Sequence, residues 1–154
     1  MSAVESKLSE LGLSLPQSAA PAGAYVPVVR TGNLAFTSGQ LPMAQGALQG
    51  QGKLGQEVSL EEGYRYAQTC TLNALAALKQ ALGSLDRISR VVKVVGFVAS
   101  APGFTAQPKV VNGASDLLLS LFGERGQHAR SAVGVAELPL GAPVEVELIV
   151  EVQD

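Results

Sequence analysis

The chain has 154 residues, the size of one domain, and 47% of them are hydrophobic while 16% are charged. This composition is typical of a folded protein and excludes a disordered chain. The net charge is −2, and no cluster of Lys and Arg lies among aromatic residues, so we expect no nucleic-acid partner. One cysteine, Cys70, and one histidine exclude an internal disulfide and argue against a structural zinc site.

The N-terminal segment Met1–Leu15 predicts a helical extension. Val4–Leu11 carries apolar residues at helical spacing, and Glu5 and Lys7 interrupt the apolar core that a signal peptide requires. No apolar stretch of the sequence reaches the length of a membrane span. We therefore expect a cytoplasmic protein without a membrane contact, and the low charged fraction favours an oligomer.

The next segment predicts a β-hairpin. A linker of small residues, Ser18–Gly23, precedes two β-like runs, Tyr25–Arg30 and Leu34–Ser38. The residues between these runs, Thr31–Asn33, contain the Gly-Asn pair typical of a tight turn. Gln40–Gly55 is rich in Gly and Gln and is expected to be a loop with room for a second, loose hairpin.

Two longer helices are predicted further along. Ser59–Leu82 has apolar residues at intervals of three and four, and Ser59 with Glu62 forms a capping-box pattern at its start. The apolar side of this helix is rich in alanine, which allows close packing on a sheet. Gln107–Phe122 has the same periodicity, and a glycine follows each helix as a stop signal.

Three further strands complete the pattern. Ile88–Ser100 is rich in valine, and Arg130–Ala136 and Val144–Val152 are the last two strands. The final strand alternates apolar and mainly acidic residues, which indicates one side on the core and one polar side. The order of elements predicts a single α+β domain over residues 1–154, a two-layer sandwich with two helices on one face of a sheet.

Arg130 is the first candidate for chemistry. It shares a strand face with Ala132, Gly134 and Ala136, which leaves open space beside a planar guanidinium suited to a carboxylate ligand. The alternative is a surface arginine whose small neighbours allow another subunit to pack closely.

Glu145 is the second candidate. A carboxylate on a rigid strand can activate water, and the alternative is a solvated face shared with Glu147 and Glu151. If the last two strands paired as a hairpin, Arg130 would oppose Val150, and Glu145 would lie roughly 17 Å away. A shared site therefore requires either a strand between the two or a second subunit.

Five other positions or segments are weaker candidates. Thr37–Gln40 ends a strand with a hydroxyl and a glycine that suit a pocket wall or an ordinary turn. Tyr25 suits a pocket wall or the core, and Asn112 suits a loop cap or a ligand contact. Cys70 is expected to be inert core, and His128 is expected to be a solvated loop residue.

The C-terminal sequence resembles a known family. Ala129–Pro139, followed by Val144–Glu147, is similar to the signature of the Rid/YjgF family, the reactive-intermediate deaminases, which are also called endoribonuclease L-PSP. The resemblance covers most of the chain, from about residue 24 to residue 152. Further matching positions are Tyr25, Gly32, Asn33, Thr37–Gln40, Phe97, Val98 and Asn112. His128 stands where the family usually has Pro or Ala.

This resemblance implies a chorismate-mutase-like fold with a mixed sheet, assembled as a homotrimer with ligand clefts between subunits. It implies that Arg130 holds a substrate carboxylate, that Glu145 positions or activates water, and that the Ala132 carbonyl helps to hold this water. The implied lining residues are Tyr25, Ser38, Gly39 and Asn112. The implied reaction hydrolyses enamines or imines such as 2-aminoacrylate and its imine to a 2-oxo acid and ammonia. The imine carbon is already electrophilic, so no cofactor or metal is expected.

Two other functions stay open at this stage. The first is a non-catalytic module that binds a 2-oxo acid or similar carboxylate through Arg130. The second is a ribonuclease, which the family name suggests and which the acidic net charge disfavours.

Overall fold

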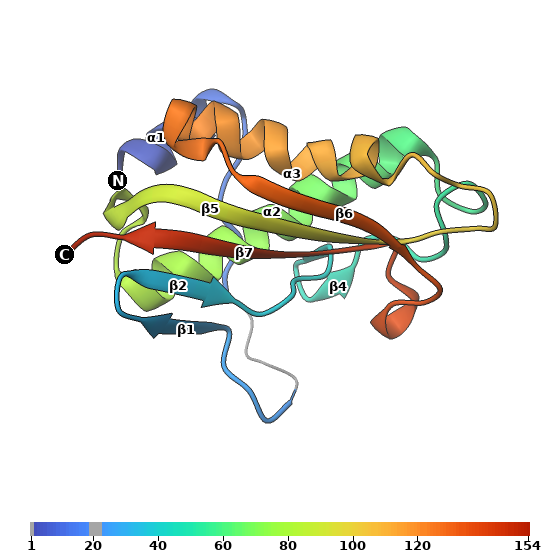
Figure 1. Cartoon of the computed structure of the whole chain (residues 1–154), viewed down its shortest axis with the longest axis horizontal. Helices are drawn as coiled ribbons and strands as arrows, with labels where there is room; N and C mark the ends of the chain where they lie inside the picture. Colours follow the sequence, from blue (N-terminus) through green and yellow to red (C-terminus); the bar gives the residue numbers. More distant parts are fainter. Residues whose placement is uncertain (1, 19–22) are drawn as a thin grey trace.

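The structure is a computed structural model that describes residues 2–18 and 23–154, so positions 19–22 of the predicted linker lie outside the described residues. It has an α+β fold with one principal sheet, seen from its open face in Figure 1. The strands of this sheet are β1 (Val28–Thr31), β2 (Leu34–Thr37), β5 (Ile88–Ala99), β6 (Ala129–Val135) and β7 (Val144–Val152). Their order is β1-β2-β7-β5-β6, and β5 and β6 are parallel while the other pairs are antiparallel, so the sheet is mixed.

Helices α2 (Leu60–Leu82) and α3 (Gln107–Phe122) pack on one face of this sheet, as predicted (Figure 1). The predicted capping box of α2 is present. The Glu62 backbone N–H donates to Ser59 Oγ at 3.2 Å, and the Ser59 backbone N–H donates to the Glu62 carboxylate at 3.0 Å. The alanine-rich side of α2 is buried, which lets the helix lie close to the strands.

The predicted N-terminal helix is α1 (Ala3–Glu10), the third helix of the fold. Val4 and Leu8 are buried, and α1 contacts α3 and the short 3-10 helix Leu85–Arg87. The Asp86 carboxylate accepts hydrogen bonds from the backbone N–H groups of Ala3 and Val4, at 3.0 and 3.3 Å. A carboxylate at this end of a helix satisfies donors that have no partner within the helix.

The first predicted hairpin forms, but its first strand begins three residues later than predicted. The strand β1 starts at Val28 because Pro27 has no N–H to donate to a ladder. The Pro27 carbonyl still accepts from the Ser38 backbone N–H at 2.8 Å, at the end of β2. The loop Gln40–Gly55 contains a small hairpin as expected, formed by β3 (Met43–Ala44) and β4 (Ala47–Leu48).

The long strand β5 lies between β6 and β7, so the last two strands do not form a hairpin. The chain passes from β5 through α3 to β6, which is the crossover that a parallel pair requires. From Lys93 to Val98, β5 pairs in unbroken register with both neighbours. Two register shifts in its pairing with β7 lie before this stretch, between Ile88 and Arg90 and between Val91 and Lys93. Two further 3-10 helices, Gly123–Gly126 and Pro139–Gly141, flank β6 along the chain.

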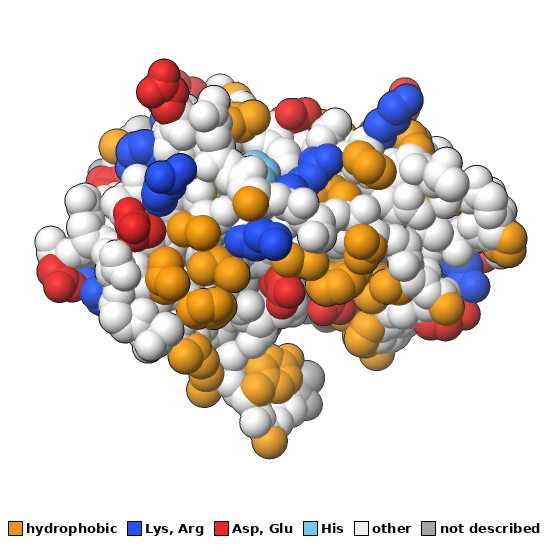
Figure 2. Space-filling model, in the orientation of Figure 1, with side chains coloured by type: hydrophobic (Ala, Val, Ile, Leu, Met, Phe, Trp, Pro, Cys, Tyr) orange, Lys and Arg blue, Asp and Glu red, His pale blue; other side chains and the backbone are white. Residues whose placement is uncertain are grey.

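The face of the sheet away from the helices is open and only partly polar. The predicted alternation of β7 is confirmed, with its valines and Leu148 buried and its acidic residues on the other side. Phe36 and Val133 on this open face are exposed, and Phe97 and Ile149 are half-buried. Figure 2 shows hydrophobic side chains gathered over these strands with acidic and basic side chains between them. Within residues 2–18 and 23–154, no helix is long and apolar enough to cross a membrane.

Candidate functional site

Arg130 lies on the helix side of the edge strand β6. It is opposite the buried Val94 in the register of β5, and its side chain reaches α3. There Nη1 donates to Asn112 Oδ1 at 2.7 Å and to Ser115 Oγ at 3.2 Å, so both hydrogens of Nη1 are used. Asn112 and Ser115 are three residues apart on one helix face, and together they hold the half-buried guanidinium.

The remaining donors of Arg130 form a free fork. Among the described residues, no group accepts a hydrogen bond from Nε or Nη2. These two nitrogens lie on one edge of the guanidinium and match the spacing of two carboxylate oxygens. Ala132 follows on the same face of β6, opposite Gly96 of β5, and leaves space beside the guanidinium. The arginine half-site is therefore defined by Asn112, Arg130 and Ala132.

His128 is not the solvated loop residue that the sequence predicted. It is half-buried, its Nδ1 lies 2.6 Å from the Gly126 carbonyl oxygen, and its Nε2 lies 2.8 Å from Ser115 Oγ. The prediction was wrong because the short 3-10 helix Gly123–Gly126 turns the chain back toward α3 before β6 begins. A histidine two residues before Arg130 was the available signal, but its contact with α3 is not local in the sequence.

Glu145 lies on the open face of the sheet, opposite Phe97 in the register of β5. Its carboxylate rests on Gly39, where a Cβ would overlap Oε2 and lie 2.9 Å from Cδ. Gly39 has no positive φ, so the glycine is needed here for space. Burial raises the pKa of the Glu145 carboxyl above its ordinary value, and the like charge of Glu147 raises this pKa further.

Ser38 and Tyr25 belong to the same side of the molecule. Ser38 Oγ donates to the Val26 carbonyl at 2.7 Å and ties the segment before β1 to the end of β2. Tyr25 in this segment is 52% exposed, so it forms no part of the core of its own chain. Figure 1 shows that this segment projects from the body below β1. The glutamate half-site is therefore defined by Ser38, Gly39 and Glu145, and the exposed Tyr25 precedes Val26, to which Ser38 donates.

The two half-sites do not meet within one chain. Arg130 and Glu145 lie on opposite faces of the sheet, and β5 separates their strands. Arg130 is level with Leu148 across β5, and Glu145 lies three residues from Leu148. Two interstrand steps and three residues along a strand put the two Cα atoms about 14 Å apart. Of the two arrangements that the sequence left open, an intervening strand is present, but it does not bring the side chains together.

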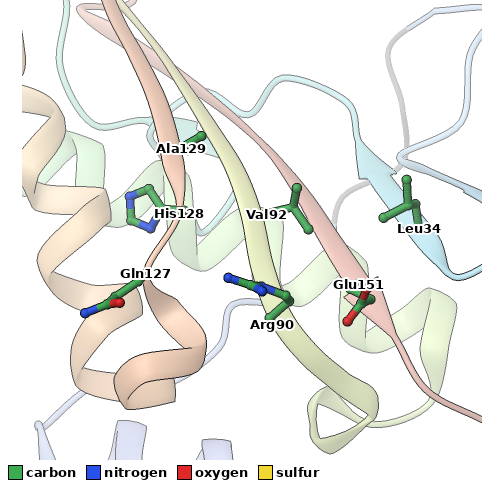
Figure 3. A pocket seen from close by; sticks show the side chains of 7 residues that line it. All are labelled: Leu34, Arg90, Val92, Gln127, His128, Ala129 and Glu151. Atoms are coloured by element: carbon green, nitrogen blue, oxygen red, sulfur yellow. The ribbon is translucent and has the colours of Figure 1, made fainter.

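A separate groove of about 570 Å³ lies on the open face near the start of β6 (Figure 3). Its lining residues are Leu34, Arg90, Val92, Gln127, His128, Ala129 and Glu151. Figure 3 shows the Arg90 side chain extending from β5 toward the segment with Gln127 and His128. None of the predicted site residues lines this groove, and no sequence motif predicts it because its residues come from four strands and one loop.

Neither the cysteine nor the acidic side chains suggest a resident metal. Cys70 is fully buried, burial raises the pKa of its thiol well above the ordinary value, and the thiol donates to the Val144 carbonyl at 3.5 Å. This confirms the predicted core position of Cys70. In the part of the chain that the structure describes, no three His, Cys, Asp or Glu side chains converge to hold a metal ion.

Comparison with known proteins identifies the family. A family model described as "YjgF/chorismate mutase-like, putative endoribonuclease" matches residues 5–152, so the chain belongs to the YjgF/Rid family. The chain is 49% identical over 154 residues to Protein TCP17 of Trypanosoma cruzi, with 98% of this chain and 95% of that protein covered. It is 32% identical over 141 residues to a 2-iminobutanoate/2-iminopropanoate deaminase of Dermatophagoides farinae, with 92% of this chain and 95% of that protein covered.

The fold also matches solved structures. The crystal structure of Atu1372 from Agrobacterium tumefaciens, a protein of unknown function, is 47% identical in sequence and superposes with a TM-score of 0.92. The match covers 98% of this chain and 93% of that one. The fold expected from the sequence resemblance, an α+β fold of the YjgF/chorismate-mutase-like type, is thereby confirmed.

Proposed function

We propose that this protein is an enamine/imine deaminase that converts imines of small 2-oxo acids to the oxo acid and ammonia. The observation that carries the proposal is the hydrogen bonding of Arg130. Its guanidinium is fixed through Nη1, and no described residue accepts from Nε or Nη2, which leaves these two donors for a carboxylate. Glu145 supplies a half-buried carboxylate whose raised pKa makes it a stronger base than an ordinary glutamate. A relative named as a deaminase of this substrate class supports the same assignment.

The proposed chemistry needs a water, an acid–base group and a carboxylate anchor. A substrate such as 2-iminopropanoate binds through its carboxylate to Arg130, and the Ala132 carbonyl and Glu145 hold the water. Glu145 takes a proton from the water as the water oxygen bonds to the imine carbon. It returns this proton to the nitrogen as the C=N double bond becomes a single bond, which gives an amino alcohol. The C–N bond then breaks, the nitrogen leaves as ammonia with a proton from the hydroxyl, and a C=O group remains. Tyr25, Ser38, Gly39 and Asn112 would line this cleft.

The proposed site is assembled between two copies of the chain. One chain offers the arginine half-site on the helix side of β6, and the other offers the glutamate half-site on its open face. The exposed Phe36 and Val133 on that open face are apolar surface that a neighbouring chain would cover. We propose a closed homotrimer, in which each chain contributes to two clefts.

The first test is turnover of enzymatically generated 2-iminopropanoate, followed by the release of ammonia above the rate of spontaneous hydrolysis. We expect the wild-type protein to accelerate hydrolysis, and Arg130→Ala and Glu145→Gln each to lower kcat/KM by about a hundredfold or more. Both variants must keep the wild-type melting temperature and oligomeric mass. A wild-type protein that hydrolyses none of several small imines at an increased rate overturns the deaminase proposal.

A second candidate function rests on the completeness of the arginine half-site. Asn112, Arg130 and Ala132 come from one chain and are arranged without any contribution from Glu145. This arrangement alone would support a module that binds a small carboxylate without catalysis. Such a module binds pyruvate with unchanged affinity after Glu145→Gln and loses binding after Arg130→Ala, with no turnover in either protein.

A further inference from the structure

A chain of hydrogen bonds connects Arg130 to a backbone carbonyl outside the arginine half-site. Arg130 Nη1 lies 3.2 Å from Ser115 Oγ, Ser115 Oγ lies 2.8 Å from His128 Nε2, and His128 Nδ1 lies 2.6 Å from the Gly126 carbonyl oxygen. These groups come from β6, α3 and the 3-10 helix Gly123–Gly126. The reaction proposed above makes no use of Ser115 or His128.

The chemistry of each group fixes the direction of this chain. The Gly126 carbonyl only accepts, so His128 Nδ1 carries the hydrogen and donates it. In the neutral imidazole Nε2 is then an acceptor, and the Ser115 hydroxyl donates to it. The lone pairs of Ser115 Oγ accept from the guanidinium, which is always charged. Donation to the imidazole makes the hydroxyl oxygen a stronger acceptor for Arg130.

The burial of these groups limits the freedom of Arg130. Ser115 is buried, at 8% exposure, and His128 is half-buried, so water competes little for the hydroxyl. Asn112 alone would leave the guanidinium free to swing about one hydrogen bond, whereas Asn112 and Ser115 together fix the direction of both Nη1 hydrogens. The plane of the guanidinium, and with it the direction of the free Nε and Nη2 fork, is therefore set by the second contact.

We propose that Ser115 and His128 are positioning residues that orient Arg130 for a ligand carboxylate. This inference rests on the proposed function in one respect, namely that Arg130 binds a carboxylate. His128 holds the Ser115 hydroxyl in one rotamer, Ser115 holds the guanidinium, and neither residue touches the substrate. These two residues, Ser115 and His128, are called the relay below. The relay therefore acts on the affinity for carboxylate ligands, in the ground state and the transition state alike.

The test compares pyruvate with pyruvamide as ligands, because pyruvamide has the same size but no carboxylate. Binding is measured by calorimetry or ligand-observed NMR for the full-length wild type, Ser115→Ala, His128→Leu, His128→Gln and Arg130→Ala. We expect Ser115→Ala and His128→Leu to weaken pyruvate binding about three- to tenfold, the effect of one hydrogen bond, and to leave pyruvamide binding unchanged. His128→Gln retains an acceptor that can reach Ser115 and should recover most of the affinity.

Kinetics give a second readout and Gln127→Ala is the matched control. Gln127 lies beside His128 and lines the same groove, but none of its side-chain atoms bonds to Ser115 or Arg130. With an imine substrate, Ser115→Ala and His128→Leu should raise KM and leave kcat near the wild-type value, while Gln127→Ala changes neither. Thermal melting of each variant reports any loss of stability separately.

The outcomes separate this inference from the proposed function. If pyruvate binding depends on Ser115 and His128 but no imine is turned over, the relay stands and the deaminase proposal fails. If imines are turned over and both relay variants bind pyruvate like the wild type, the relay is overturned and the deaminase proposal stands. Equal losses for pyruvate and pyruvamide with a lower melting temperature indicate a purely structural role and also overturn the relay. A wild-type protein that does not bind pyruvate overturns the relay as well.

Discussion

The two half-sites are built by different physical means. The arginine half-site consists of directed hydrogen bonds, in which α3 and the segment before β6 fix a charged group from one side. In the glutamate half-site, none of the described residues donates a hydrogen bond to the Glu145 carboxylate. Glu145 is placed by shape, with a glycine beneath it, and its pKa is raised by burial and by a neighbouring charge.

This difference matches the two tasks that we propose. A group that only binds an anion must stay charged and keep one orientation, and hydrogen bonds to other parts of the guanidinium provide both conditions. A group that exchanges protons must change its charge state, and strong hydrogen bonds to its charged form would lower its pKa and oppose this change. Variants of the two half-sites should therefore differ in how they change ligand binding, catalytic rate and pH dependence.

The largest effect is expected from mixing two inactive variants. Arg130→Ala chains keep an intact glutamate half-site, and Glu145→Gln chains keep an intact arginine half-site. If each cleft is formed by two chains, co-expression or co-refolding of the two variants in equal amounts should restore about a quarter of the sites. Activity per chain of the mixed sample, measured by ammonia release, checks this expectation.

The control for this experiment is the same two variants mixed after separate folding, which should stay inactive while subunits do not exchange. Absence of recovery in co-expressed oligomers of confirmed mixed composition would show that each site uses both residues of one chain. That result contradicts a cleft between copies.

A smaller effect is expected when the shape of the glutamate half-site changes. In Gly39→Ala the new methyl group occupies the position of Glu145 Oε2, so the carboxylate must move away. We expect kcat to fall about 10- to 100-fold, as for a catalytic group that is misplaced by about 1 Å. The melting temperature should change little, because the displaced atoms are the end of a flexible side chain.

A double variant tests the cause of this loss. Because Gly39→Ala acts through Glu145, it should cause no further loss of activity in a Glu145→Gln background. Additive losses in the double variant would mean that Gly39 contributes independently of the carboxylate.

The smallest effect is a shift in pH dependence. The deprotonated form of Glu145 is the proposed base, so kcat/KM should fall when the pH drops through its raised pKa. Glu147→Gln removes the like charge that contributes to this raised pKa, and the acidic limb of the profile should move to lower pH. Glu151 lies on the same face of β7 but about 20 Å from Glu145, so Glu151→Gln should leave the acidic limb in place. A shift to higher pH in Glu147→Gln would contradict the assignment of this limb to Glu145.

Much of the fold could be predicted because its signals are local. The capping box at Ser59 and Glu62 and the alternation of Val144–Val152 each depend on neighbours within a few residues, and both are found in the structure. The start of β1 was misplaced because the apolar run Tyr25–Arg30 contains Pro27, which excludes ladder pairing at that position.

The arrangement of the candidate site could be predicted only in part, because it depends on contacts between distant segments. The sequence placed Arg130 and Glu145 on strands, but it did not show that β5 separates them or that they use opposite faces. The role of His128 was missed for the same reason, since its partner Ser115 lies on α3. Strand order and helix docking follow from the summed packing of the whole chain, which no short motif encodes.

The long strand β5 has one further consequence, which concerns changes in chain length. Its first part already contains two register shifts, so an added or lost residue between 88 and 92 can be absorbed by an existing irregularity. From Lys93 to Val98 the register is unbroken on both sides, with Val94 beside Arg130 and Phe97 beside Glu145. One inserted residue between Val94 and Phe97 would move every later side chain of β5 to the opposite face of the sheet. The strand could then no longer keep its core side chains buried and pair correctly beside both Arg130 and Glu145. We therefore expect insertions and deletions to be tolerated at the start of this strand and to abolish function in its second half.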